Sequence, residues 1–152
     1  MSHFIRLDKI KATAHIETVV HTEELKNGQF VELGVSHEDL GGEAVAIEKT
    51  EVGKAPEAIV TTVHLDYGNT DYNPLELVTK AGKAGRAHII EKGNMISFLK
   101  EMAVGVAVGN DVTVGTGGFG IKVAEDGEEV IGKVIREDYM ANVGDLLVVR
   151  FK

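Results

Sequence analysis

The chain has 152 residues, no cysteine and a formal net charge of −8. These values fit one domain and exclude disulfide frameworks, thiolate zinc sites and cysteine nucleophiles. Lys and Arg form no cluster of the kind that tracks a phosphate backbone, so we expect no nucleic-acid partner. We also expect no membrane partner, because no apolar run is long enough to span one as a helix. The first residues lack the apolar core of a signal peptide, which predicts synthesis in the cytoplasm.

One short phrase occurs four times along the chain: a polar or small run, a glycine, a polar residue and then an alternating apolar strand. The glycines are Gly28, Gly93, Gly109 and Gly144. Glycine reaches the positive φ of tight turns, and alternation is typical of half-buried strands. The unequal spacing excludes a solenoid or propeller, which needs a fixed period. The phrases therefore predict a mainly β fold, a small β-barrel or sandwich with tight Gly-Asn and Asp-Gly turns.

Taken in chain order, the first elements are an extended N-terminal arm over residues 1–22 and a single β-rich domain over residues 23–152. The pattern of the arm is compatible with a helix or a strand, and an extended arm is predicted because no turn residue interrupts it before Asn27-Gly28. One or two helical turns are expected over 75–81. We expect residues 86–91 and 95–99 to pair with each other. Strands are predicted over 25–35, 44–49, 59–65, 86–91 and 95–99, where β-branched and alternating residues gather.

The C-terminal part reads as strand and turn almost without interruption. Residues 104–108 are expected to pair with 112–114. Asp126-Gly127 lies between the alternating runs 121–125 and 128–136, which predicts a hairpin. The last strand is predicted over 146–151.

The N-terminal arm combines apolar and basic residues in a chain that is otherwise acidic. Its apolar side chains would have no core if the arm were a free tail. They could add a strand to the protein's own sheet or to the edge of a partner's sheet. Both alternatives stay open. The residues that we expect to bind a partner are Phe4, Ile5, Arg6, Leu7 and Ile10.

One segment, Gly115–Gly120, matches the glycine spacing of a dinucleotide-binding turn. That mechanism needs a helix after the glycines, so that the helix N-terminus meets the pyrophosphate. Here the pattern that follows is a strand and a turn, which favours an ordinary loop. The sequence therefore predicts no cofactor.

Other candidate sites have equally simple structural interpretations. Residues 69–73 alternate oxygen ligands like the start of a calcium loop, but the turn glycine and the bidentate glutamate are missing. The six histidines match no metal-ligand spacing. Ser97 is expected on the outer face of a strand, and the acidic stretch 125–129 is expected to be a solvated hairpin tip. We predict no catalytic residue, no metal ligand and no enzymatic activity.

The segment 59–98, with Gly82-Lys83-Ala84-Gly85 and Lys92-Gly93-Asn94 in it, resembles structural proteins encoded beside the major capsid protein of tailed bacteriophages. The ending, from Gly109-Asn110-Asp111 to Gly144-Asp145, is similar to capsid decoration, or cement, proteins with a small β-barrel. Together these segments cover most of the chain after about residue 25. The shared motifs are turn phrases, and the family has no catalytic residues to carry over.

This resemblance implies a virion structural protein that binds the outer surface of a phage head and stabilises the lattice of the major capsid protein. The implied partners are the major capsid protein and further copies of the chain, and monomer, dimer and trimer all stay open. One alternative is a small β-barrel enzyme or ligand-binding domain with a pocket near His37, His64, Asp66 and Asp71. Another is a subunit of a phage tail or connector.

Overall fold

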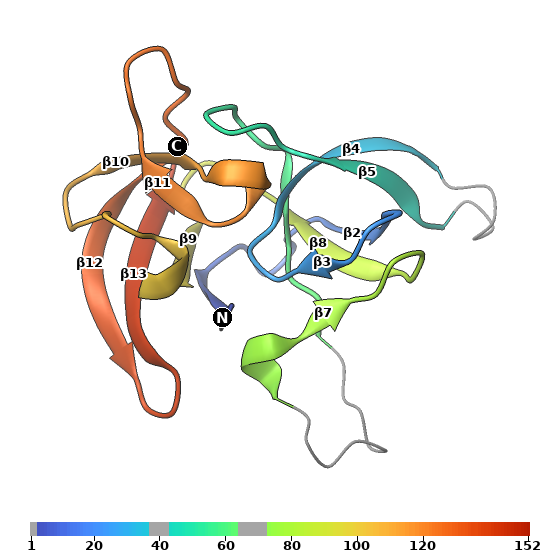
Figure 1. Cartoon of the computed structure of the whole chain (residues 1–152), viewed down its shortest axis with the longest axis horizontal. Helices are drawn as coiled ribbons and strands as arrows, with labels where there is room; N and C mark the ends of the chain where they lie inside the picture. The colour runs from blue at the N-terminus through green and yellow to red at the C-terminus, as the bar shows by residue number, and fades with distance from the viewer. Residues whose placement is uncertain (1–2, 37–42, 64–72) are drawn as a thin grey trace.

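The computed structural model describes residues 3–36, 43–63 and 73–152, and the mainly β prediction is confirmed (Figure 1). One sheet has six strands in the order β1–β9–β13–β12–β10–β11, and every neighbouring pair is antiparallel. Its strands are β1 (Ile5–Lys9), β9 (Met95–Leu99), β10 (Asp111–Val114), β11 (Ile121–Val123), β12 (Gly132–Met140) and β13 (Gly144–Phe151).

A closed five-stranded barrel lies beside this sheet, in the order β2–β5–β4–β6–β8. The pair β2–β5 is parallel and the other pairs are antiparallel. Closure leaves the barrel without an unpaired edge. Its strands are β2 (Ile16–Val20), β4 (Phe30–Ser36), β5 (Val45–Lys49), β6 (Ala58–Val60) and β8 (Gly85–Ile89).

Short elements complete the fold. Strands β3 (Leu25–Lys26) and β7 (Val78–Thr79) form a two-stranded sheet. The 3₁₀ turn η2 (Pro74–Glu76) lies where helical turns were predicted, but β7 takes over the second half of that range. Two further 3₁₀ turns are η3 (Lys100–Met102) and η4 (Thr116–Gly118).

Buried residues form two clusters. The smaller one fills the barrel interior and includes Val31, Ala58 and Val60. The larger one lies between the barrel and the six-stranded sheet and includes Phe30 and Ile59 of the barrel. Because successive side chains of a strand point to opposite faces, Phe30 and Ile59 face the sheet while their neighbours face the barrel interior. Strands β4 and β6 thus each contribute side chains to both clusters.

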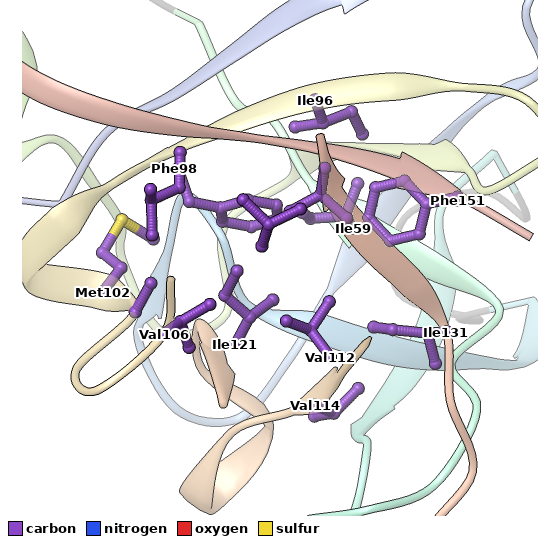
Figure 2. Packing of buried hydrophobic residues seen from close by; sticks show 14 of the residues in the cluster. Ile59, Ile96, Phe98, Met102, Val106, Val112, Val114, Ile121, Ile131 and Phe151 are labelled. Atoms are coloured by element: carbon purple, nitrogen blue, oxygen red, sulfur yellow. The ribbon is translucent and has the colours of Figure 1, made fainter. Parts of the chain in front are cut away.

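We call the larger cluster the junction. Its centre is a group of three aromatic rings: the Phe30 centroid lies 5.9 Å from that of Phe98 and 6.3 Å from that of Phe151. Figure 2 shows Phe98, Ile59 and Phe151 in one row, with the side chains of Ile121 and other residues of the sheet opposite them. Phe30 comes from the barrel and the other two rings come from the sheet, so these contacts hold the two parts together.

The four repeated glycine phrases are turns, as predicted. Gly28, Gly93, Gly109 and Gly144 all have positive φ, between 90° and 121°. At two of these turns the asparagine after glycine stabilises the backbone further, because the Oδ1 atoms of Asn94 and Asn110 accept hydrogen bonds from the amides of Glu91 and Ala107.

Three predicted strand pairings are wrong. Strand β8 lies in the barrel and β9 in the six-stranded sheet, so the Gly93 turn carries the chain from one sheet to the other. Residues 104–108 form turns, with Gly105 at φ +78°, and are not a strand. Strands β11 and β12 both pair with β10 and not with each other. Asp126-Gly127 does turn the chain, but β10 lies between β11 and β12, the two strands that this turn connects.

Candidate interaction surfaces

The predicted partner-binding residues lie in or beside β1, which is an edge strand of the six-stranded sheet. Ile5 and Leu7 are half-buried, stand opposite Phe98 and Ile96 of β9, and pack on the junction. The carbonyl oxygen of Phe4 accepts a hydrogen bond from the amide of Leu99 at 3.2 Å. The structure therefore realises the alternative in which the arm adds a strand to the protein's own sheet.

Other described residues of the predicted arm also contact the body of the protein. The amide of His3 donates to the carbonyl oxygen of Leu75 at 2.8 Å, and His3 is 4% exposed. Residues 16–20 form β2 of the barrel. Ile10 is half-buried just after β1. Whether these residues also contact a partner stays a prediction, and the strand that carries them has a sheet neighbour on one side.

Arg6 belongs to an ion network on the face of the sheet. Its Nη2 atom lies 2.6 Å from Oδ2 of Asp138 in β12, and its Nε donates to Oδ1 of Asp8 at 2.5 Å. The Asp8 side chain is only 8% exposed, and its Oδ2 also accepts from the hydroxyl of Ser97. These contacts raise the pKa of Arg6 and lower the pKa of Asp138, because each charge stabilises the other.

Sequence reasoning missed this network and predicted the wrong environment for Ser97. Ser97 does point to the face opposite the junction, but it is fully buried under Arg6 and Asp8. The separation of 132 residues between Arg6 and Asp138 gives no sequence signal. Arg6 and Asp8 are two residues apart in β1, and their side chains are paired with each other.

The Gly115–Gly120 segment is a packed loop between the two sheets. It forms η4 and then β11, so the element after the glycines is a strand, as predicted. The amide of Gly120 donates to the carbonyl of Gly28, and the Gln29 side chain donates to the carbonyl of Gly117. The glycines let the backbones of the sheet and the barrel approach closely.

The acidic stretch 125–129 does more than solvate a hairpin tip. Oε2 of Glu128 lies 2.9 Å from the ammonium of Lys122. Oε2 of Glu129 accepts a hydrogen bond from the amide of Ala55, in the loop after β5 of the barrel. This loop therefore helps to connect the sheet to the barrel.

His3 and His88 are the buried histidines among the described residues. His88 is 5% exposed, and its Nδ1 lies 2.6 Å from the hydroxyl of Thr61. Burial lowers its pKa, with a smaller effect from Arg86. The four residues proposed to line an enzymatic or ligand pocket, His37, His64, Asp66 and Asp71, lie outside the described residues, as do residues 69–72 of the calcium-like loop.

Neither a metal-binding group nor a membrane-spanning helix is found among residues 3–36, 43–63 and 73–152. The same residues expose several large apolar side chains. Tyr139, 69% exposed, lies with Met140 at the tip of the β12–β13 hairpin. Val104, 83% exposed, borders a hollow of about 230 Å³ that Met102 and Phe119 also line.

Comparisons with known proteins give a likeness in fold. No protein-family model matches the chain, and no curated protein matches it. Among solved structures, the chain is similar to the N base of the head fiber protein gp8.5 of bacteriophage phi29, with a TM-score of 0.55 and 13% sequence identity. The match covers 92% of this chain and 95% of the other. The two proteins therefore share a fold over nearly their whole compared lengths.

Proposed function

We propose that this protein is a non-enzymatic structural protein of a phage virion, which binds the outer surface of the head and stabilises the lattice of the major capsid protein. The observation that carries the proposal is the fold shared with the head fiber base of phage phi29 over 92% of the chain. The turn phrases that resemble decoration proteins support it independently, because they come from the sequence alone.

The described structure suits a mechanical role. Two sheets joined through one apolar junction give a rigid body, since closely packed interiors transmit strain and have few voids. The polar clusters around Arg6, His88 and Glu128 make hydrogen bonds and ion pairs within the fold. Contacts of this kind support a structural role, because they connect strands of the protein to one another.

Strand β1 is the best candidate for the capsid contact. Among the described residues it pairs with β9 alone, and we infer that its other side accepts a strand from a partner. Phe4, Arg6 and Ile10 lie on or beside this edge. Strand addition supplies backbone hydrogen bonds, and repeated copies on a symmetric shell add avidity.

The test is co-sedimentation of the purified protein with expanded capsid shells that lack it, together with the melting temperature of the shells. We expect saturable binding and a higher melting temperature. A protein that stays in the supernatant at micromolar concentration and leaves the melting temperature unchanged would contradict the proposal.

A pair of variants tests the contribution of β1. Ile10→Asp places a charge beside β1, and Val123→Asp places one on β11, the strand at the opposite edge of the same sheet. We expect Ile10→Asp to weaken shell binding about tenfold or more, as for a central contact residue, and Val123→Asp to leave it unchanged. Equal binding by both folded variants would exclude β1 as the contact.

A tail or connector subunit is the second candidate, because the phage-type fold is compatible with both locations. Antibody labelling of intact virions distinguishes them. Label spread over the head supports the decoration role, whereas label confined to one vertex or to the tail supports the alternative.

A further inference from the structure

Two pairs of like charges stand directly opposite each other on neighbouring strands, one pair in each sheet. In the barrel, Glu32 of β4 is the register partner of Glu48 of β5. In the six-stranded sheet, Lys133 of β12 is the register partner of Arg150 of β13. All four residues are exposed. Like charges at directly opposed positions destabilise a sheet, so the isolated chain retains two unfavourable pairs of opposite sign.

The positive pair lies at a hollow of about 290 Å³, which we call the basic hollow. Lys92 and Lys152 border it together with Lys133 and Arg150, and the half-buried Ile135 also lines it. Within the described residues, the carboxylate nearest to one of these cations is Asp111, whose Oδ1 lies 3.9 Å from Nζ of Lys133. Four cations thus converge on one surface of a chain whose net charge is −8.

The negative pair lies at a second hollow, of about 530 Å³, which we call the acidic hollow. It is lined by Glu32, Glu48, Glu51 and Glu129, with Lys49 and Lys54. Lys49 is engaged elsewhere, since its ammonium lies 2.8 Å from Oε2 of Glu23. Among the described residues, Glu32, Glu48 and Glu51 have no ion-pair partner, so the surface carries an excess of negative charge.

We propose that the basic hollow of one copy of this chain docks on the acidic hollow of a second copy. The charges of the two surfaces are complementary. The cations of the basic hollow would neutralise the Glu32–Glu48 pair, and the carboxylates of the acidic hollow would neutralise the Lys133–Arg150 pair. Ile135 and the aliphatic parts of the lysine side chains give the contact apolar area, and the charges give it register and partner choice. This inference concerns self-association and does not depend on the proposed capsid contact.

The contact is between two different surfaces, one on each sheet. Such an association either closes by making both contacts reciprocally between two copies, or continues head to tail into a ring or an open chain of copies. In each geometry every contact pairs the same two surfaces. A charge substitution should therefore weaken a closed dimer and a head-to-tail assembly alike, so the test below does not depend on which of them forms.

The experiment measures the molar mass of the full chain by sedimentation velocity over a range of concentrations, at about 20 mM and about 500 mM salt. We expect concentration-dependent association at low salt that weakens at high salt. The charge reversals K133E/R150E and E32K/E48K should each weaken association about tenfold or more. Matched reversals on other exposed residues, K80E/K83E and E24K/E101K, should leave it unchanged.

Charge exchange makes the test specific. An equimolar mixture of the K133E/R150E and E32K/E48K variants should associate again, because each retains the surface that complements the other. The variant with all four substitutions should also associate, since both surfaces are exchanged together. Circular dichroism melting checks that each variant folds, and the neutral pairs K133T/R150T and E32T/E48T replace K133E/R150E or E32K/E48K if that variant does not.

Three outcomes would overturn the proposal. The wild-type chain could remain monomeric at low salt at every concentration. The charge reversals could associate as well as the wild type. The mixture of folded variants could fail to associate, which would show that the two hollows do not contact each other.

Discussion

The barrel interior and the junction differ in the size of the side chains that they bury. The barrel interior holds small and medium side chains such as Val31, Ala58 and Val60. The junction holds three phenylalanine rings and most of the isoleucine, leucine and valine side chains of the six-stranded sheet. A closed five-stranded barrel leaves little internal volume, because barrel diameter grows with strand number. Most of the apolar surface that this chain can bury therefore lies outside the barrel, where the two sheets meet.

From this difference we predict that neither sheet folds as a separate unit. Phe30 and Ile59 belong to barrel strands but are buried only because the six-stranded sheet covers them. Backbone hydrogen bonds cross the same boundary, from Gly53 to Val114 and from Gly120 to Gly28. We therefore expect a single cooperative unfolding transition of the whole chain.

The largest effect is expected for Phe98→Ala at the centre of the junction. The ring is fully buried against Phe30 and Phe151. Its removal leaves a cavity that the surrounding strands cannot close, so unfolding should become easier by about 3–5 kcal/mol. Urea denaturation measures this. Phe98→Leu, which keeps most of the volume, is the control and should cost clearly less. Two separate transitions in Phe98→Ala would contradict the single cooperative unit.

Gly118→Ala should give the next largest effect. Gly118 has φ +77°, and a Cβ atom there would lie 2.6 Å from the carbonyl oxygen of Thr50 in the barrel. Gly109→Ala is the matched control, because it shares the positive φ but has open space around it. We expect a loss of about 2–3 kcal/mol for Gly118→Ala and about 1 kcal/mol for Gly109→Ala. Equal losses would mean that the two sheets do not approach closely at Gly118.

Val60→Ala tests the barrel interior. Val60 is fully buried there, and the loss of its two methyl groups should cost about 2 kcal/mol. Val112→Ala makes the same change in the junction, where Val112 is also fully buried. We expect similar losses of stability, because both substitutions remove the same two methyl groups from a fully buried site. The junction contributes more to stability because its side chains are larger. A loss for Val60→Ala as large as that for Phe98→Ala would reverse the comparison.

The smallest effect is a pH dependence from His88. Burial lowers the pKa of His88 in the folded protein below its ordinary value of about 6.5. The unfolded chain therefore binds the proton more readily, so this stabilisation is present above about pH 6.5 and is lost as the pH falls toward the folded pKa. Thermal melts at pH 7.5 and pH 5.5 should show a larger decrease for the wild type than for His88→Gln. Identical decreases would exclude His88 as the source.

Local features of this fold could be predicted from the sequence. Each glycine phrase needs only a positive φ and a following strand, so Gly28, Gly93, Gly109 and Gly144 were identified correctly. The strand over 95–99 was predicted with its observed bounds. The mainly β class, with a barrel, followed from the same signals.

Long-range pairing could not be predicted. A turn such as Asp126-Gly127 shows that the chain reverses, but not that β10 lies between β11 and β12. The Gly93 turn looks like a hairpin, and nothing local indicates that β8 and β9 enter different sheets. The same limit applies to the candidate surfaces. The Glu32–Glu48 and Lys133–Arg150 pairs become visible only once the strand register is known.

The most direct test of the proposed function is electron microscopy of expanded shells incubated with the purified protein. The account predicts ordered density for the two-sheet body at symmetry-related positions on the outer surface, with β1 at the contact. Density on the inner surface, density at the tail vertex alone or shells without added density would contradict it.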